Sequence, residues 1–82
     1  MRAVILPELG PAIEKAVVSF WFFKEGDQVK ENEDLVELTT DKAAFNIPSP
    51  CNGILVEIFF REGDTVQVGE VLANIQELPE DK

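Results

Sequence analysis

Two copies of one sequence pattern lie in this chain, and the repeat restricts the possible folds more than any other feature. The first copy is residues 22–38, FFKEGDQVKENEDLVEL, and it aligns without a gap on residues 59–75, FFREGDTVQVGEVLANI. Upstream, Leu6-Pro7 resembles Ile47-Pro48 if the first copy contains four additional residues. Because two copies are too few for a solenoid, the repeat predicts two similar halves that pack about a pseudo-twofold axis.

Each half has the pattern of short β-strands separated by turns. Val, Ile and Phe are frequent, and turn signals recur every eight to twelve residues: 7–11, 25–27, 31–34, 41–42, 48–53, 62–64 and 68–70. Residues 13–20 are the best helix candidate, but the segment is short and contains two β-branched valines, so we assign it to a strand. The chain is therefore predicted to be all-β, a sandwich or flattened barrel.

Alternation along the strands assigns each side chain to the inside or the outside. Trp21 and Phe23 face inward in the first half, and Ile58 and Phe60 do so in the second. The predicted core also contains Val18, Val29, Leu35, Leu38, Phe45, Ile47, Leu55, Val66, Leu72 and Ile75. The same parity turns three aromatic side chains outward: Phe20, Phe22 and Phe59. We expect a bulge or an overlying loop to cover them; the alternative is a patch that docks a partner.

The junction between the two copies contains residues 40–43, Thr-Asp-Lys-Ala. Hairpin turns more often contain Gly or Asn, which raises the question whether this turn presents the amine of Lys42. The symmetry mate of the junction is the place where the chain begins and ends, so Lys42 is predicted to project from the end opposite both termini. Alternation sorts the neighbouring side chains into an inward set, Ala43, Phe45 and Ile47, and an outward set, Lys42, Ala44 and Asn46.

The composition argues against several classes of function. Seven Lys and Arg against sixteen Asp and Glu give a net charge of −9, so nucleic acid and anionic membranes are poor partners. The chain has no His, no phosphate-binding Gly loop and no Cys/His set for zinc, so we expect neither catalysis nor a metal site. Cys51 is alone, which fits a reducing compartment. The short apolar run before Pro7 is unlike a secretory signal, and no stretch reaches membrane-spanning length.

The order and spacing of five blocks resemble a lipoyl domain of the biotinyl/lipoyl-attachment family: LPELG, WFFKEGDQV, LVELTTDKAAFNIPSP, GILVEI and REGDTVQVGEVLANI. The similarity covers residues 3–76. It implies a flattened barrel of two four-stranded antiparallel sheets, with lipoic acid amide-linked to Lys42 on a hairpin. Asp41 and Ala43 would flank the attachment site for recognition, although Asp41 could instead accept a hydrogen bond in the turn. Residues 1–77 would form the domain, and 78–82 an acidic tail or the start of a linker.

The resemblance also implies a function, that of a non-catalytic carrier domain within a dihydrolipoamide acyltransferase. A lipoate ligase or lipoyltransferase would modify Lys42, because the chain offers no base to activate the amine. The swinging arm would then carry acyl groups and reducing equivalents in a 2-oxo acid dehydrogenase complex. It would visit a thiamin-diphosphate 2-oxo acid decarboxylase, the acyltransferase core and dihydrolipoyl dehydrogenase. We expect the chain in the cytoplasm of a bacterium or archaeon, or in a mitochondrial matrix or plastid.

Alternative functions and two departures from the family pattern accompany this prediction. A biotin carrier usually has Met on both sides of its Lys, whereas Asp41 and Ala43 are the lipoyl form. The glycine-cleavage H protein has further elements that are missing here, and an unmodified interaction module would depend on the outward aromatic residues. Thr39 stands where an acid is common, and residues 10–15, GPAIEK, replace a Gly-Glu-Gly-Ile pattern. The pyruvate, 2-oxoglutarate, branched-chain and acetoin systems are therefore not distinguished.

Overall fold

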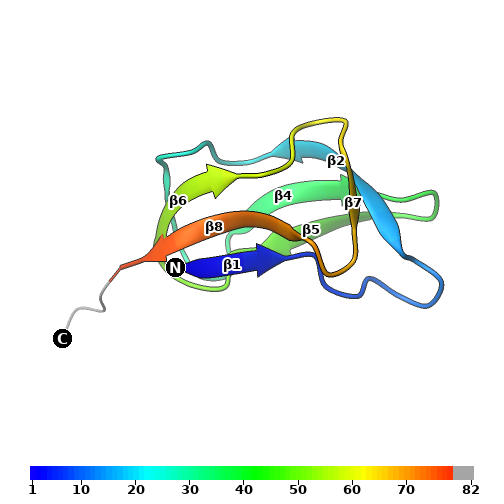
Figure 1. The fold of residues 1–82 in the computed structure, drawn as a ribbon, viewed down its shortest axis with the longest axis horizontal. Helices are drawn as coiled ribbons and strands as arrows, with labels where there is room; N and C mark the ends of the chain where they lie inside the picture. Colours follow the sequence, from blue (N-terminus) through cyan, green and yellow to red (C-terminus); the bar gives the residue numbers. More distant parts are fainter. Residues whose placement is uncertain (79–82) are drawn as a thin grey trace.

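The structure, a computed structural model that describes residues 1–78, is a flattened β-barrel made of two sheets (Figure 1). Its strands are β1 (Arg2–Ile5), β2 (Lys15–Trp21), β3 (Gln28–Val29), β4 (Asp34–Thr39), β5 (Ala44–Pro48), β6 (Gly53–Ile58), β7 (Thr65–Gln67) and β8 (Val71–Glu77). All pairings are antiparallel, with strand orders β1-β8-β6-β3 and β5-β4-β2-β7. The predicted fold class is confirmed. Across residues 1–78 no helix could cross a membrane, and the predicted tail or linker falls, from residue 79 onward, outside the described residues.

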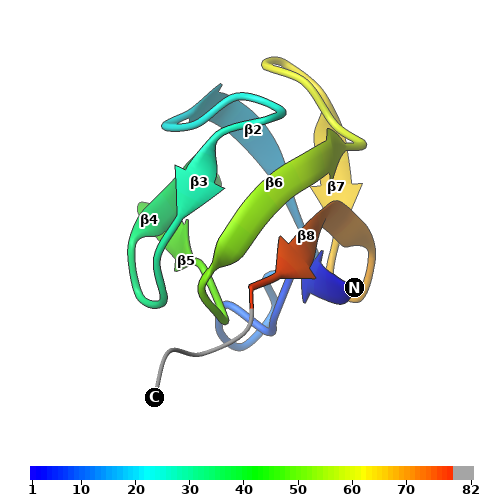
Figure 2. The same ribbon diagram turned by 90° about the vertical axis from the view of Figure 1, so that its left-hand side faces the viewer.

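The pseudo-twofold relation exchanges the two sheets. Replacing β1, β8, β6 and β3 by their counterparts β5, β4, β2 and β7 converts one strand order into the other. The hydrogen bonds repeat as well: the Gly26 amide donates to the Leu55 carbonyl at 2.6 Å, and the Gly63 amide donates to the Val18 carbonyl at 2.8 Å. Figure 2 views the domain from the end that holds Met1 and the end of β8, with β3, β6 and β8 of one sheet in front.

The core lies between the sheets and contains the side chains predicted there. Nine of the ten further predicted core residues are buried, and Phe45 is half-buried. Trp21, Phe23, Ile58 and Phe60 are partly buried and pack against this core. Leu35 and the next residue, Val36, are both fully buried, which strict alternation does not allow. The register of β4 and β5 shifts between Asp34 and Val36, and such a bulge lets consecutive side chains face the same side.

The outward aromatic residues are not covered, so the expectation of a covering bulge or loop was wrong. Phe20, Phe22 and Phe59 are 38%, 44% and 46% exposed. The register of β2 and β4 does shift between Val18 and Phe20, but the irregularity does not bury the rings. Phe20 and Phe22 instead contact each other edge to face, with ring centroids 4.7 Å apart. Phe22 follows the end of β2, two residues after Phe20, and each ring shields only part of the other.

The structure also corrects the alignment of the two copies upstream of the main repeat. Leu6 exchanges backbone hydrogen bonds with residues 69–70, and Ser49 exchanges the equivalent bonds with residues 32–33. Leu6 is therefore the counterpart of Ser49, so the pairing of Leu6-Pro7 with Ile47-Pro48 was wrong by two residues. Short dipeptides do not carry enough information to place an insertion, whereas backbone hydrogen bonds do.

The corrected alignment shows where the halves differ most. Nine residues, 7–15, connect Leu6 to Ala16 in the first half, whereas three residues, 50–52, connect the equivalent positions in the second. The longer connection forms the β1–β2 loop at one end of the domain (Figure 1). The β4–β5 hairpin lies at the same end, opposite Met1 and the end of β8 (Figure 1). The prediction that this hairpin projects away from both termini is confirmed.

Candidate functional site

The hairpin between β4 and β5 is closed by hydrogen bonds of one residue, Thr40. Its amide donates to the Ala43 carbonyl at 2.8 Å. Its hydroxyl oxygen accepts from the Lys42 amide at 3.1 Å and from the Ala43 amide at 3.0 Å, and the hydroxyl lies 3.0 Å from the Ala43 carbonyl oxygen. A Thr hydroxyl that accepts hydrogen bonds from the amides two and three residues ahead stabilises a turn that contains no Gly or Asn. Thr40 therefore sets the backbone from which the Lys42 side chain departs.

The three residues predicted at the site, Asp41, Lys42 and Ala43, are brought together and exposed at the hairpin tip. The one ion pair among residues 1–78 joins Arg2 to Glu77, at the other end of the domain. The turn bonds come from Thr40 and not from Asp41, so the turn-acceptor role considered for Asp41 belongs to its neighbour. Sequence reasoning missed Thr40, although a Thr two residues before the Lys is a known turn signal.

Ala43 was predicted to face inward, but it is not buried. Ala43 precedes β5, which begins at Ala44, and its side chain is exposed. Along β5 the exposure then falls, with Phe45 half-buried and Ile47 buried. Alternation sets the face to which a strand residue points, but a side chain on the inner face is buried only where the other sheet covers it. A small side chain next to Lys42 leaves its amine unobstructed.

The β1–β2 loop lies beside the hairpin and shares a hollow with Asp41. Loop residues Glu8 and Glu14 line this hollow together with Asp41, Gln67 of β7 and the neighbouring Val68. The Val68 amide donates to the Glu14 carbonyl at 3.0 Å, which ties the loop to the turn after β7. Three carboxylates and the cation of Lys15 therefore line the hollow at the hairpin base.

The GPAIEK departure contains a tight turn with a strained residue. The Ile13 amide donates to the Gly10 carbonyl at 3.2 Å, with Pro11 and Ala12 between them. Ala12 has a φ of 66°, a left-handed conformation that costs an alanine about 1–2 kcal/mol relative to the right-handed one. Pro followed by a residue with positive φ is the arrangement of a type II turn. The loop beside Lys42 is thus held in one shape by Pro11 at the expense of strain at Ala12.

Thr39, the other departure from the family pattern, has a hydrogen-bond partner within its own sheet. The hydroxyl groups of Thr39 and Ser19 are hydrogen-bonded to each other across β4 and β2. Ser19 lies at the irregularity in β2, between Val18 and Phe20. The neutral Thr39 thus replaces the common acid with a side chain that binds its own sheet.

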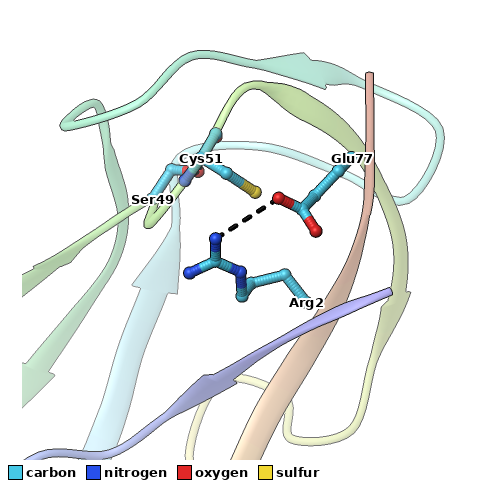
Figure 3. A network of polar contacts seen from close by, with 4 residues as sticks. All are labelled: Arg2, Ser49, Cys51 and Glu77. Carbon is cyan, nitrogen blue, oxygen red and sulfur yellow. Dashed lines mark hydrogen bonds and ion pairs between the residues drawn. The ribbon is translucent and has the colours of Figure 1, made fainter. Parts of the chain in front are cut away.

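Cys51 lies at the opposite end of the domain and is buried (Figure 3). The Ser49 hydroxyl donates to the Cys51 carbonyl at 2.6 Å. Burial raises the pKa of the Cys51 thiol, and the charge of Glu77, toward which the side chain points, raises it further. A buried thiol that holds its proton is a poor nucleophile. Within residues 1–78, no three side chains of metal-ligating type come together.

Comparison with protein families gives one match along most of the chain. The biotin/lipoyl family, described as "Biotin-requiring enzyme", matches residues 2–75. The succinyltransferase component of the 2-oxoglutarate dehydrogenase complex of Rickettsia bellii is 40% identical over 74 residues, which is 90% of this chain and 18% of that protein. The acetyltransferase component of the pyruvate dehydrogenase complex of Mycobacterium bovis is 46% identical over 74 residues, 90% of this chain and 13% of that protein. The chain thus spans less than a fifth of the length of these relatives.

Solved structures agree with these matches. The lipoyl domain of the 2-oxoglutarate dehydrogenase complex from Azotobacter vinelandii superimposes with a TM-score of 0.76 at 32% identity, covering 94% of this chain and 98% of that one. The lipoyl domain of the Escherichia coli dihydrolipoyl succinyltransferase gives a TM-score of 0.76 at 34% identity, covering 94% and 96%. A long-chain acyl-CoA carboxylase, at 22% identity and a TM-score of 0.73, shares the fold alone.

Proposed function

Because this chain belongs to the biotin/lipoyl family, and within it to the lipoyl domains, we propose that it carries lipoic acid in amide linkage to Nζ of Lys42. The observation that carries this proposal is the placement of Lys42, exposed at the tip of a closed turn at the end of the domain away from the termini. The surroundings fit a covalent arm, since Ala43 is small and both neighbours are exposed. Asp41 and Ala43 are proposed as the flanking residues that the attaching enzyme contacts.

The protein supplies position and the attached group supplies chemistry. When bound, the dithiolane of lipoic acid provides reversible acyl carriage and two-electron exchange. Thr40 holds the backbone of Lys42, and the barrel behind it gives the arm a rigid base. No ion pair involves Lys42 in the described part of the chain, so no neighbouring carboxylate holds the amine against the domain. The domain therefore acts as a tethered substrate and not as a catalyst.

The partners follow as part of the same proposal. The relatives that match are acyltransferase components of 2-oxo acid dehydrogenase complexes, which supports a role inside a longer acyltransferase. Lys42 would be loaded by a lipoate ligase or lipoyltransferase. The arm would then meet a thiamin-diphosphate 2-oxo acid decarboxylase, the acyltransferase core and dihydrolipoyl dehydrogenase in turn. Tethering makes each encounter intramolecular, at effective concentrations of around millimolar for a suitable linker.

The proposal names 2-oxo acids as the substrate class of the complex and does not select one compound. Relatives named for 2-oxoglutarate and for pyruvate complexes match at 40% and 46% identity over the same length. We propose the cytoplasm of a bacterium or archaeon, or a mitochondrial matrix or plastid, as the compartment. The free thiol of Cys51 supports a reducing environment.

Mass spectrometry tests the attachment directly. The chain is co-expressed in parallel with a lipoylating and with a biotinylating enzyme, and its intact mass and peptides are measured. We expect a lipoyl increment on Lys42 that Lys42→Arg abolishes and that the matched surface variant Lys24→Arg retains. A biotin increment instead would transfer the domain to carboxylase chemistry. Modification by neither enzyme would overturn the carrier function and favour an interaction module centred on the exposed aromatic residues.

A further inference from the structure

A shallow groove begins at the base of the lysine hairpin and runs across the outer face of the β5-β4-β2-β7 sheet. Thr40 and Asp41 of the hairpin line it, together with Lys15 and Ala16 of β2. A row of side chains from three strands, Thr39, Val17 and Thr65, completes the lining and is called its floor here. Val17 on β2 pairs with Thr39 on β4 and with Thr65 on β7, so the three lie side by side across the sheet. The floor therefore consists of one valine and two threonines, each of which contributes methyl groups.

Val17 is one of several exposed apolar side chains of the domain, with an exposed fraction of 41%. Its neighbours in the row are both threonines, which are too short to cover it. An isolated exposed apolar side chain needs no explanation, but this one lies in a depression that adjoins the proposed attachment site. The internal symmetry of the domain shows whether this arrangement is a property of the fold.

The equivalent row in the other sheet is built differently. The counterparts of Thr39, Val17 and Thr65 are Gln76, Ile54 and Gln28, and these also pair directly across their strands. Ile54 is larger than Val17 but is half-buried. Long glutamine side chains thus flank the apolar residue at the end of the domain that holds the termini, and short threonines flank it at the lysine end. A row in which short threonines flank an exposed valine is therefore a feature of the lysine end and not of the fold.

We propose that this groove, named here the Val17 groove, seats the apolar end of the lipoyl arm between its visits to partner sites. The inference rests on the proposed attachment of lipoic acid to Lys42. Thr39 is three residues from Lys42, which is at most about 10 Å along an extended strand. The arm between the Lys42 Cα and the ring contains about ten single bonds of about 1.5 Å each. Val17 and Thr65 lie one and two strand spacings of about 4.8 Å further across the sheet, which places Thr65 at most about 14 Å from Lys42. The arm therefore reaches the row while it remains attached.

The chemistry of the arm and of the groove agree. The dithiolane ring and its methylene chain are apolar, and contact with Val17 and the threonine methyl groups removes apolar surface of both from water. Because the arm is tethered, a weak contact is sufficient, since its effective concentration is around millimolar. The groove is shallow and open to solvent, so the arm remains able to leave. Seating would shield the dithiolane without a lid.

Isotope-filtered NMR on the labelled domain, unmodified and enzymatically lipoylated with unlabelled lipoate, tests the proposal. We expect lipoylation to shift the methyl signals of Val17, Thr39 and Thr65, and to give nuclear Overhauser effects from the dithiolane protons to these methyl groups. Val17→Ser should abolish the effects at Thr39 and Thr65. The matched variant Ile54→Ser, at the equivalent site of the other sheet, should leave them intact. The paired substitution Thr39→Gln with Thr65→Gln, which copies the other row, should also abolish them.

Intact mass of every sample separates the two proposals. A lipoyl increment on Lys42 with signal changes confined to residues 40–43 would overturn the Val17 groove and leave the carrier function standing. Effects to a different surface, such as the rings of Phe20 and Phe22, would overturn it as well. Absence of any lipoyl increment would overturn the carrier function and the groove together. Amide spectra of the unmodified variants show whether Val17→Ser keeps the fold, as expected for an exposed side chain.

Discussion

At the scale of single residues, the site depends on a side chain that carries no chemistry of its own. Lys42 provides the amine, but the Thr40 hydroxyl accepts the amide hydrogen bonds that hold the turn. Neither glycine nor asparagine occupies residues 40–43, so the turn has little help from residues that prefer a left-handed backbone. A loosened turn would present Lys42 in many directions to an enzyme that must recognise one.

We predict that Thr40→Val loosens the hairpin while Thr40→Ser preserves it. The valine has a similar shape but cannot accept the two amide hydrogen bonds, so the free energy of unfolding should fall by about 1 kcal/mol. Hydrogen exchange of the Lys42 and Ala43 amides should accelerate in Thr40→Val more than the global loss of stability accounts for. Lipoylation of Lys42 should slow in the same variant. Equal exchange rates in the valine and serine variants would show that the hydroxyl does not hold the turn.

At the scale of strands, the two halves differ where β4 and β8 end. β8 continues to Glu77 and pairs there with Gly53 at the start of β6. β4 ends at Thr39, so Ala16, the counterpart of Gly53, has no partner from that strand. A Cβ at Gly53 would overlap the Gln76 carbonyl oxygen and lie 2.6 Å from Ile75 Cγ2, whereas Ala16 accommodates its Cβ in the core. The lysine hairpin can project because β4 leaves the sheet one residue early.

This difference predicts opposite tolerance at two equivalent positions. Gly53→Ala should destabilise the domain by about 2 kcal/mol or more, because the strand backbone of β8 must shift to admit the methyl group. Ala16→Gly should cost about 1 kcal/mol, from lost packing and greater freedom of the unfolded chain. Urea denaturation of both variants measures the two values. A smaller loss for Gly53→Ala than for Ala16→Gly would contradict the close approach of β6 and β8.

At the scale of the whole molecule, the repeat is not two small domains. Only one strand pairing lies inside each half: β2 with β4 in the first, and β6 with β8 in the second. The other four pairings, β1–β8, β3–β6, β5–β4 and β2–β7, join the two halves. Most of the hydrogen-bonded sheet therefore exists only when both copies are present. The same interleaving places Met1 and the end of β8 at one pole and the hairpin at the other (Figure 1).

Either half alone should consequently remain unfolded. Peptides 1–42 and 43–82 each lack the partners of their edge strands, and an isolated two-stranded unit is at best marginally stable in water. We expect collapsed amide dispersion and little β-sheet circular dichroism for each peptide alone, with native-like dispersion appearing on equimolar mixing. A well-dispersed amide spectrum from one peptide by itself would mean that a half is an independent folding unit.

The sequence alone determined the features that depend on local periodicity and on the repeat. A gapless second copy with period-two alternation leaves few ways to bury Leu35, Leu55 and their equivalents, so the fold class, most of the core and the pole of Lys42 could be predicted. The motif around Lys42 predicts the site for the same reason, since its residues are consecutive in the chain.

Only the tertiary structure decided what depends on the register between strands. The exposure of Phe20 and Phe22 and the Val17 groove depend on how strands distant in sequence are placed against each other. The alignment of the β1–β2 loop likewise depends on backbone hydrogen bonds between distant residues. Thr40 and Asp41 are both close enough in sequence to accept hydrogen bonds from the amides of the turn. The backbone conformation of the folded hairpin determines that Thr40 accepts them. Periodicity assigns a side chain to one face of a strand. Whether that side chain is buried depends on segments elsewhere in the chain that pack over this face.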